Sequence, residues 1–336
     1  MQAVHQTRYG SARCLAIAER PRPVPAADEV LVKVAAASLH PDVWHMVSGL
    51  PWVLRLMGAG LRRPKNPVPG TDLSGVVEAV GVKVTRFKPG DAVFGETIRG
   101  MQWVNGGAFA EWACAPESGL ALKPGNLGME EAACLPTAGL IASLNLRHLG
   151  RLRPGCRVLV NGAAGGVGSL AVQMAMAEGC AVTGVDSAER LGWLHGLGVM
   201  HTIDYRAEDF TRCGEHFDLI LDIPANHSLR DIKRVLSPTG VWIVVGHDHF
   251  GQGMHKVFGL LPRMFGLMAL AIFDRNLPRP DFRMPDKAAE MEYLRGLAET
   301  GRLKPRVDRV FPLGEVREAL MYLQEGRAEG RVVLAP

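Results

Sequence analysis

The fold of this chain is decided by one stretch, Arg157-Val158-Leu159-Val160-Asn161-Gly162-Ala163-Ala164-Gly165-Gly166-Val167-Gly168. Its apolar run, Val158 to Val160, predicts a short buried strand of a parallel sheet. The residues after the turn, Ser169 to Ala177, favour a helix by composition, and Gly179 can end that helix. A strand, a glycine-rich turn and a helix in this order predict a βαβ unit whose turn can bind an anion.

The turn has the spacing Ala163-x-Gly165-x-x-Gly168, with alanine where the dinucleotide-binding pattern usually has its first glycine. Glycine allows the backbone to approach a pyrophosphate closely, and the free N–H groups at the helix start point at the anion. The alternative is a glycine-rich turn in an α/β domain that binds no nucleotide. We predict that the turn binds a dinucleotide through Ala163, Gly165, Gly166, Val167 and Gly168.

Further strands follow the turn, with helical patterns between them. The apolar run Ala181 to Val185 ends at Asp186, roughly 20 residues past the turn, where an acidic side chain can bind a ribose. Later apolar runs, Phe217 to Asp222 and Gly240 to Gly246, end in polar or glycine residues. This alternation predicts an α/β fold with a Rossmann doubly wound parallel sheet.

The composition limits the class of protein. The chain has 336 residues, 47% hydrophobic and 21% charged, which indicates a globular protein large enough for two domains. Its net charge of +4 is spread over interspersed acids and bases, so we expect no nucleic-acid partner. The N-terminus lacks the pattern of a signal peptide. The 6 cysteines form no C-x-x-C pair, which fits small buried side chains in a reducing cytoplasm.

One apolar stretch stands out, Val257 to Phe273, which Pro262 and Arg263 interrupt. It is too short and too broken for a membrane-spanning segment. We interpret it as helices that line a cleft or form a subunit interface. Contact with a membrane surface is the alternative interpretation.

The first part of the chain, to about Lys123, is rich in predicted strands. Short apolar runs separated by proline and glycine predict strands at residues 29–35, 73–81 and 108–113. The turn Pro89-Gly90-Asp91 leads into a further strand. Together these elements predict a small barrel-like fold. After a helical region from residue 129 and the parallel sheet, the chain ends in a helix (286–301), a strand (306–311), a helix (313–325) and a strand (330–334).

Several motifs in this order resemble the medium-chain dehydrogenase/reductase superfamily, and within it the zinc-free quinone oxidoreductase-like branch. They are Val68 to Glu78, Phe87 to Gly95, Gly107 to Glu111, and Gly165 to Gly168. The resemblance implies a GroES-like β-rich catalytic domain (1–123), a Rossmann nucleotide-binding domain (124–282) and a C-terminal segment (283–336) that returns to the catalytic domain. It also implies a homodimer.

The resemblance allows the zinc ligands of the superfamily's alcohol dehydrogenases to be sought in this sequence. The histidine position is Thr71, and the cysteine positions fall near Leu39 and Thr137. The segment Glu96 to Gly106, where a structural zinc loop would lie, contains no cysteine. None of these residues is a preferred zinc ligand, so we predict no catalytic metal. A loosely bound metal at His247-Asp248-His249 is the remaining alternative.

The cofactor preference depends on the end of the second Rossmann strand. Asp186 can accept hydrogen bonds from both ribose hydroxyls and repel a 2′-phosphate, which favours NADH. The resemblance to quinone reductases instead implies that a hydroxyl residue, a basic residue and a tyrosine bind the 2′-phosphate of NADPH. The matching residues here are Ser187, Arg190 and Tyr205. We predict NADPH, with NADH as the alternative. Gly246 is expected to line the nicotinamide.

The segment His40-Pro41-Asp42-Val43-Trp44-His45 occupies the position of the superfamily's substrate cleft. Trp44 can stack on a flat ring, and His40 or His45 can donate a hydrogen bond to the oxygen on which charge develops. The alternative is that Trp44 packs in the core and both histidines are capping or surface residues. We predict an NAD(P)H-dependent oxidoreductase that reduces a quinone, an enone or another carbonyl substrate. The alternatives are an alcohol or aldehyde dehydrogenase, and a nucleotide-binding protein without turnover.

Overall fold

The computed structural model describes residues 1–100, 104–246, 256–279 and 285–336. One of its sheets is parallel throughout, with strand order β10-β9-β8-β11-β12. The strands are β8 (Arg157–Asn161), β9 (Ala181–Asp186), β10 (His201–Asp204), β11 (Phe217–Asp222) and β12 (Leu236–Val244). The order reverses between β8 and β11, and ligands of open α/β sheets bind at such a switch point.

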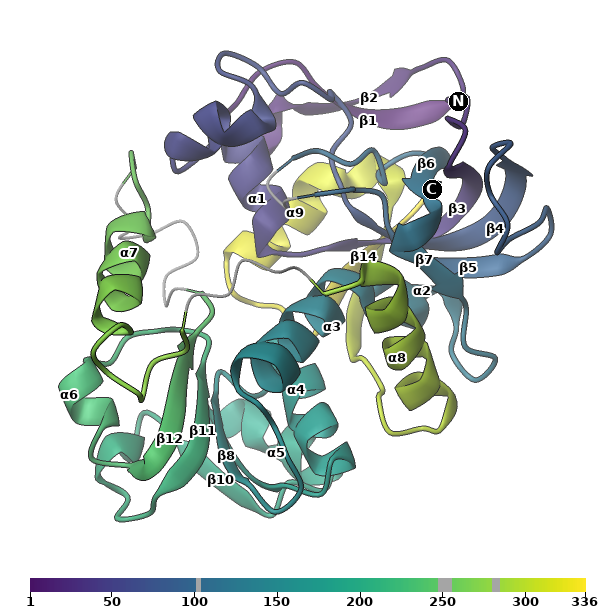
Figure 1. The fold of residues 1–336 in the computed structure, drawn as a ribbon. Coiled ribbons are helices and arrows are strands. Elements are labelled where there is room, and N and C mark those ends of the chain that lie inside the picture. Colours follow the sequence, from purple (N-terminus) through teal and green to yellow (C-terminus); the bar gives the residue numbers. More distant parts are fainter. Residues whose placement is uncertain (101–103, 247–255, 280–284) are drawn as a thin grey trace.

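Helices flank this sheet, which lies in the lower part of Figure 1. They are α3 (Pro136–Ser143), α4 (Gly166–Ala177), α5 (Ala188–Gly196), α6 (Leu229–Ile232) and α7 (Leu261–Leu270). A one-turn π-helical segment, Leu144–Leu149, continues α3. Helix α4 begins at Gly166, three residues before the predicted start, because Gly165 already has the extended backbone of an N-cap.

A second sheet has the order β13-β14-β3-β4-β5-β7, and β6 also pairs with β3. Its strands are β3 (Glu29–Leu39), β4 (Asp72–Val80), β5 (Ala92–Glu96), β6 (Trp112–Pro116), β7 (Leu120–Leu122), β13 (Val307–Pro312) and β14 (Arg331–Ala335). Strand β14 pairs antiparallel with β3, so that Val333 lies opposite Ser38. The last strand of the chain is therefore part of the sheet formed by its first third.

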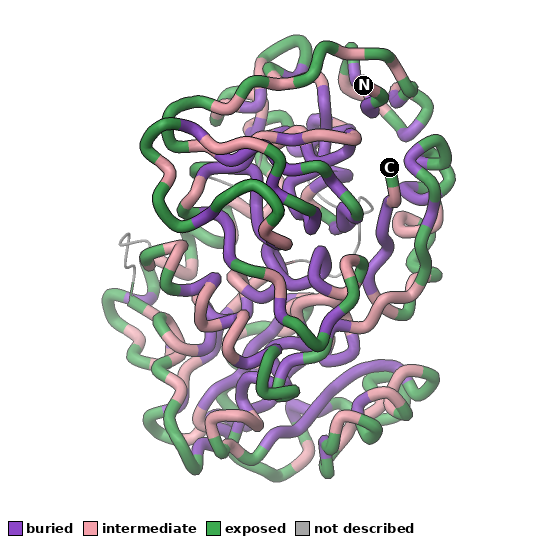
Figure 2. Tube along the Cα trace, turned by 90° about the vertical axis from the view of Figure 1, so that its right-hand side faces the viewer, coloured by how far each residue is buried: buried purple, intermediate pink, exposed green. Residues whose placement is uncertain are grey.

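The remaining elements cover this second sheet and connect it to the first. They are the hairpin of β1 (Gln2–Gln6) and β2 (Leu15–Glu19), and the helices α1 (Pro41–Ser48), α2 (Met129–Ala133), α8 (Lys287–Glu299) and α9 (Val316–Gln324). Figure 2 shows that the buried stretches of chain run through the interior of both halves and that most of the exposed stretches lie at the periphery.

The predicted fold class, an α/β protein that joins a β-rich domain to a doubly wound parallel sheet, is confirmed. Some strands differ from the prediction. The run 108–113 was expected as one strand, but the ladder with β3 begins at Trp112, and Ala110 forms only an isolated bridge with Ala3. The hairpin β1–β2 and the three-residue strand β7 were not expected, because runs this short carry little periodicity.

Candidate active site

The glycine turn between β8 and α4 leaves backbone donors available for an anion. Gly162 has φ +81°, a left-handed conformation that favours glycine. The amides of Gly166, Val167 and Gly168 lie in the first turn of α4, where no intrahelical acceptor exists and no side chain caps the helix. A Cβ on Gly168 would lie 2.0 Å from the carbonyl oxygen of Gly162, so glycine is required there for the turn to close.

Alanine is tolerated at the first glycine position because the facing strand has a glycine. The Ala163 amide donates to the Val185 carbonyl oxygen at 3.0 Å, which holds the turn against β9. A Cβ built on Gly184 would lie 3.2 Å from the Ala163 Cβ, so Gly184 supplies the space that the alanine methyl group occupies. The departure from the usual pattern thus leaves the geometry of the turn intact.

The Asp186 side chain is buried and directed toward the glycine turn. Its Oδ2 accepts from the Ala164 amide at 2.8 Å, and its Oδ1 accepts from the Ser187 amide at 2.9 Å. Each oxygen keeps a further lone pair, because a carboxylate oxygen can accept more than one hydrogen bond. Asp186 therefore lies where a ribose would follow the pyrophosphate, with part of its charge compensated by the two amides.

The other predicted ribose-end residues lie around this carboxylate. Ser187 is the buried N-cap residue of α5, and the Tyr205 amide donates to the Asp186 carbonyl oxygen at 3.2 Å, with its side chain 53% exposed. The Arg190 Nη2 donates to the carbonyl oxygens of Gly326 and Ala328, at 3.2 and 3.0 Å. Arg190 is therefore anchored to the C-terminal segment beside the site.

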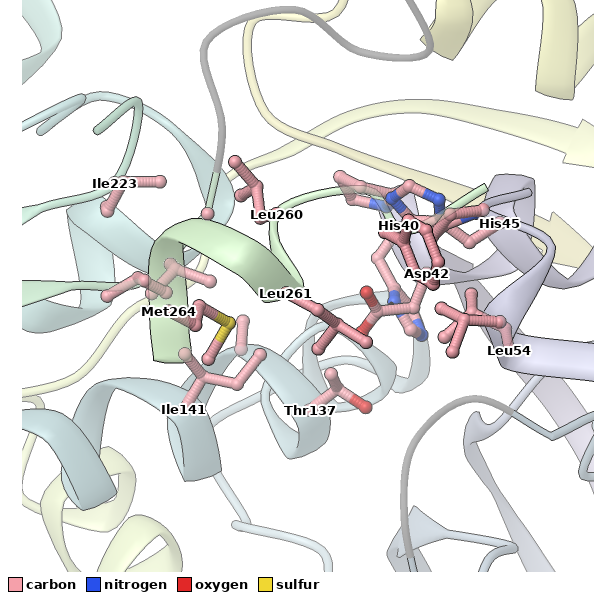
Figure 3. A pocket seen from close by; sticks show the side chains of 18 of the residues that line it. His40, Asp42, His45, Leu54, Thr137, Ile141, Ile223, Leu260, Leu261 and Met264 are labelled. Atoms are coloured by element: carbon pink, nitrogen blue, oxygen red, sulfur yellow. Dashed lines mark ion pairs between the residues drawn. The ribbon is translucent and has the colours of Figure 1, made fainter. Parts of the chain in front are cut away.

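A cavity of about 260 Å³, shown in Figure 3, lies between the carboxyl ends of the parallel strands and helix α1. Val167, Ile223, Val245 and the predicted Gly246 line one side, at the carboxyl ends of the parallel strands. The opposite and flanking sides are formed mainly by α1, the segment after it, α3 and α7, through His40, Pro41, Asp42, His45, Pro51, Val53, Leu54, Thr137, Ala138, Ile141, Phe258, Leu260, Leu261, Met264 and Arg331. The cavity is mostly apolar, with its polar groups near α1 and Thr137.

Of the predicted substrate-cleft residues, two histidines line this cavity and the tryptophan does not. Trp44 is 7% exposed and packs in the core of the first domain. The His45 Nδ1 lies 2.8 Å from the Leu50 carbonyl oxygen, and because a carbonyl only accepts, Nδ1 must be the protonated nitrogen. His40 is almost fully buried at the start of α1, and its Nε2 lies 2.9 Å from the Thr71 hydroxyl.

A network of buried polar groups occupies the place where the resemblance puts zinc ligands. The Thr71 hydroxyl lies 3.2 Å from Asp72 Oδ1, and the Thr137 hydroxyl lies 2.5 Å from the same oxygen. The Thr137 amide donates to Asp72 Oδ2 at 3.1 Å. Asp72 is fully buried and forms an ion pair with Arg331, whose Nη2 lies 3.3 Å from Oδ2.

The same network extends away from the cavity to Glu96 and Lys287. The Thr137 hydroxyl also lies 2.6 Å from Glu96 Oε1, and the Lys287 Nζ donates to Glu96 Oε2 at 2.7 Å. Burial raises the pKa of Glu96 and the nearby Asp72 carboxylate raises it further, whereas Lys287 and Thr137 oppose the rise. The pKa of Asp42 is also shifted: burial opposes its ionisation, but His40, together with the charges of His45 and Arg331, outweighs burial and holds the pKa below its usual value.

The residues present fit a dinucleotide better than a metal. The free amides of α4 and the Arg331 guanidinium, which lies against Gly166, suit a pyrophosphate, and Asp186 suits a ribose. Over residues 1–100, 104–246, 256–279 and 285–336, no three His, Cys, Asp or Glu side chains converge in a way that could hold a metal ion. The predicted alternative at His247 and His249 lies outside the described residues.

Arg331, Asp72 and Glu96 were not predicted as site residues. Asp72 lies in the quoted motif Val68 to Glu78, but nothing in the sequence indicates that an arginine 259 positions later contacts it. The apolar stretch predicted at Val257 to Phe273 forms α7, which lines the cavity through Leu261 and Met264. None of the helices in the described ranges is long and apolar enough to cross a membrane, and the cytoplasmic location stays a prediction.

Comparison with known proteins agrees with this geometry. A family model described as alcohol dehydrogenase GroES-like domain matches residues 26–125, and one described as zinc-binding dehydrogenase matches residues 197–334. The quinone-oxidoreductase homolog of Spinacia oleracea chloroplasts is 29% identical over all of this chain and 98% of its own. The 2-methylene-furan-3-one reductase of Solanum lycopersicum is 31% identical over all of this chain and 79% of its own. The solved structure of the Coxiella burnetii quinone oxidoreductase superposes with a TM-score of 0.80, at 26% identity, over all of this chain and 99% of its own.

Proposed function

The chain belongs to the medium-chain dehydrogenase/reductase superfamily as a quinone-oxidoreductase-like oxidoreductase, and we propose that it reduces a quinone or an α,β-unsaturated carbonyl with NADPH and without zinc. One observation carries the proposal. The cavity joins the dinucleotide turn to a group of hydrogen-bonding side chains. Where the resemblance puts the superfamily's zinc ligands, this chain has Thr71 and residues near Leu39 and Thr137. The names of the spinach and tomato relatives fit this substrate class.

The glycine turn and β14 hold the cofactor in this proposal. The amides of Gly166, Val167 and Gly168 bind the pyrophosphate, and Arg331 adds a positive charge beside Gly166. NADPH, when bound, supplies a hydride to the substrate. Gly246, at the carboxyl end of the parallel sheet, leaves room for a flat ring, since it adds no side chain to the cavity wall.

The substrate oxygen needs a hydrogen-bond donor, because hydride addition leaves negative charge on it. Leucine and threonine side chains do not replace thiolate or imidazole as zinc ligands. His40 is the better-placed histidine to act as the donor, because the Nδ1 hydrogen of His45 is already given to the Leu50 carbonyl. In this proposal His40 orients and polarises the substrate, and the apolar wall from α7 excludes water.

The preference for NADPH rests on the surroundings of Asp186. Two amides already compensate its carboxylate, which weakens its repulsion of a 2′-phosphate. Within the described ranges Arg190 forms no ion pair, and only its Nη2 is used to anchor it, so Nε and Nη1 can meet a phosphate. The neighbouring Arg206, by contrast, is paired with Glu189.

The test is turnover by protein whose metal content has been measured. We expect a panel of quinones and enones to be reduced by NADPH in samples with no stoichiometric zinc, and we expect Arg190→Ala to weaken NADPH binding much more than NADH binding. Arg212→Ala is a matched control, because this exposed arginine is already paired with Asp209. Absence of turnover across the panel, or oxidation of simple alcohols that depends on bound zinc, would overturn the proposal.

A further inference from the structure

The buried polar network includes one hydroxyl that lies between two carboxylates. The Thr137 Oγ1 is 2.5 Å from Asp72 Oδ1 and 2.6 Å from Glu96 Oε1. Both are hydrogen-bond distances, but a hydroxyl has one hydrogen and can donate to only one of the two oxygens. If both acids were ionised, the second contact would place two lone pairs against each other. A second hydrogen is therefore required, on one of the two carboxyl groups that contact the Thr137 hydroxyl.

Glu96 is the carboxyl group that can best carry this hydrogen. Asp72 accepts from the Thr137 amide and pairs with the buried Arg331, so its anionic form is well compensated. Glu96 is equally buried and has Lys287 as its cation. Burial and the nearby Asp72 charge both raise the Glu96 pKa, with Lys287 and Thr137 acting in the opposite direction. A protonated Glu96 donates to Thr137, which then donates to Asp72.

The network connects solvent to the cavity. Lys287, at the start of α8, is 23% exposed and contacts Glu96. At the other end, the Thr71 hydroxyl lies 3.2 Å from Asp72 Oδ1 and 2.9 Å from the Nε2 of His40, to which it donates when the relay delivers a proton. His40 lines the cavity, and its second ring nitrogen lies 3.6 Å from Asp42. We call this set the buried relay; in order from solvent, its members are Lys287, Glu96, Thr137, Asp72, Thr71 and His40.

We propose that Glu96 stores a proton behind the cavity and that the buried relay delivers a proton through His40 to the reduced substrate. This inference rests on the proposed function, because reduction by a hydride leaves one negative charge that one proton must neutralise. His40 gives the hydrogen on Nδ1 to the substrate, whose lone pair forms the new bond, while the N–H electrons stay on nitrogen. Nε2 takes the hydrogen of the Thr71 hydroxyl, and Thr71 then accepts one from Asp72. Asp72 has by then been protonated by Thr137, which in turn takes the stored proton of Glu96.

The transfer is balanced at the solvent end. When Glu96 has given up its proton, the Lys287 ammonium passes one to the carboxylate and takes another from water. One solvent proton is thus consumed for each hydride accepted. Glu96 and Thr71 act through His40, and Thr137, which borders the cavity, passes its hydrogen to Asp72 and not to the substrate, so all three are relay members.

The stored proton is tested in protein without cofactor, by infrared spectroscopy near neutral pH. A protonated carboxyl gives a carboxylic C=O stretch that an ionised one lacks, and we expect this band in the wild type, absent in Glu96→Gln. Glu290→Gln is the matched control, because Glu290 is also buried but accepts from Arg147 and His148 and has a lowered pKa. The band should persist in that variant. A wild type without the band, or one whose band survives Glu96→Gln, would overturn the proposal.

Delivery is tested by kinetics with an accepted quinone or enone. Thr137→Val breaks the relay while keeping the side-chain shape, and we expect kcat to fall about 100-fold, with an altered solvent deuterium isotope effect and unchanged NADPH affinity. Thr97→Val is the control, because the Thr97 hydroxyl is also buried nearby but donates to the Thr71 carbonyl and is not a member of the relay. Equal kcat and isotope effects in the two variants would overturn delivery. If no substrate is reduced at all, the proposed function and delivery both fail, and the infrared band alone decides whether Glu96 stores a proton.

Discussion

The Arg331 guanidinium forms an ion pair with the Asp72 carboxylate, with 3.3 Å between Nη2 and Oδ2, although 259 positions separate the two residues. Arg331 also donates through Nε to Ser38 at 3.1 Å and lies against Gly166 of the dinucleotide turn. One side chain therefore links the last strand, the buried polar network and the glycine turn. It ties the C-terminal segment to both halves of the site.

Replacing this arginine should affect stability and cofactor binding together. Arg331→Ala leaves the Asp72 carboxylate buried without its cation, and loss of one partner of a buried pair costs roughly 3–5 kcal/mol. We expect the free energy of unfolding in urea to fall by about that amount and NADPH affinity to fall as well. Arg331→Lys keeps the positive charge, so this variant should lose less stability and less NADPH affinity than Arg331→Ala. An Arg331→Ala protein as stable as the wild type would show that the pair contributes little.

The glycine turn should not accept a methyl group at its last glycine. Gly168→Ala places a Cβ 2.0 Å from the Gly162 carbonyl oxygen, so the turn must open, and we expect dinucleotide binding to be lost in a fluorescence titration. The control is Gly192→Ala, within α5, where a Cβ would meet no atom of the described residues within 4 Å. That variant should bind normally and gain up to about 1 kcal/mol in stability. Unimpaired binding by Gly168→Ala would contradict the assigned role of the turn.

The pH dependence of stability should depend partly on Glu290. Burial opposes its ionisation, but hydrogen bonds from Ser143 and His148 and the charge of Arg147 outweigh burial, so the pKa of Glu290 is lowered in the folded protein. A lowered pKa stabilises the fold above the unfolded-state value, about 4.3, and this contribution is lost as the pH falls further.

Glu290→Gln should therefore be less stable than the wild type at pH 7, by about 2 kcal/mol. The difference should shrink steadily below about pH 4, where the wild-type carboxylate is being protonated. Urea unfolding at a series of pH values measures it. A difference that stays constant over this range would mean that the charge of Glu290 is not responsible.

The outer side of the α7 region is apolar and exposed. Phe265 is 62% exposed and Phe273 is 89% exposed, while Leu261 and Met264 face the cavity. If this surface forms the homodimer contact that the resemblance implies, Phe265→Ser with Phe273→Ser should shift sedimentation velocity from dimer to monomer. Val82→Ser is a control, because this exposed side chain lies in a turn after β4, far from α7 in the sequence. A wild type that already sediments as a monomer would contradict this assignment.

The strand, turn and helix to which we assign dinucleotide binding were predictable from the sequence because they are local. One strand, one turn and one helix place Ala163, Gly165 and Gly168 within a few residues of each other, and Asp186 follows at the end of the next strand. Periodicity and glycine spacing report such short-range geometry directly. The space that Gly184 provides for Ala163 also comes from adjacent parallel strands.

The substrate end was less predictable because its contacts join distant parts of the chain. Trp44 lies beside His45 in sequence, but neighbouring side chains on a helix point about 100° apart, and α1 directs Trp44 into the core. Glu96 and Lys287 are separated by 191 positions, and Thr137 and Asp72 by 65. Nothing in one sequence reports such pairs, and the short strands β1, β2 and β7 escaped prediction because they depend on their pairing partners.

The central claim, hydride transfer to a conjugated acceptor without zinc, is tested most directly by isotope tracing on a metal-analysed sample. NADPH deuterated at the transferable position is mixed with an enone in ordinary water, and the product is examined by NMR and mass spectrometry. We predict one deuterium on the β-carbon and one hydrogen from solvent on the product, at zinc contents far below one per chain. A product without deuterium, or activity that disappears when zinc is chelated and returns when zinc is added, would contradict it.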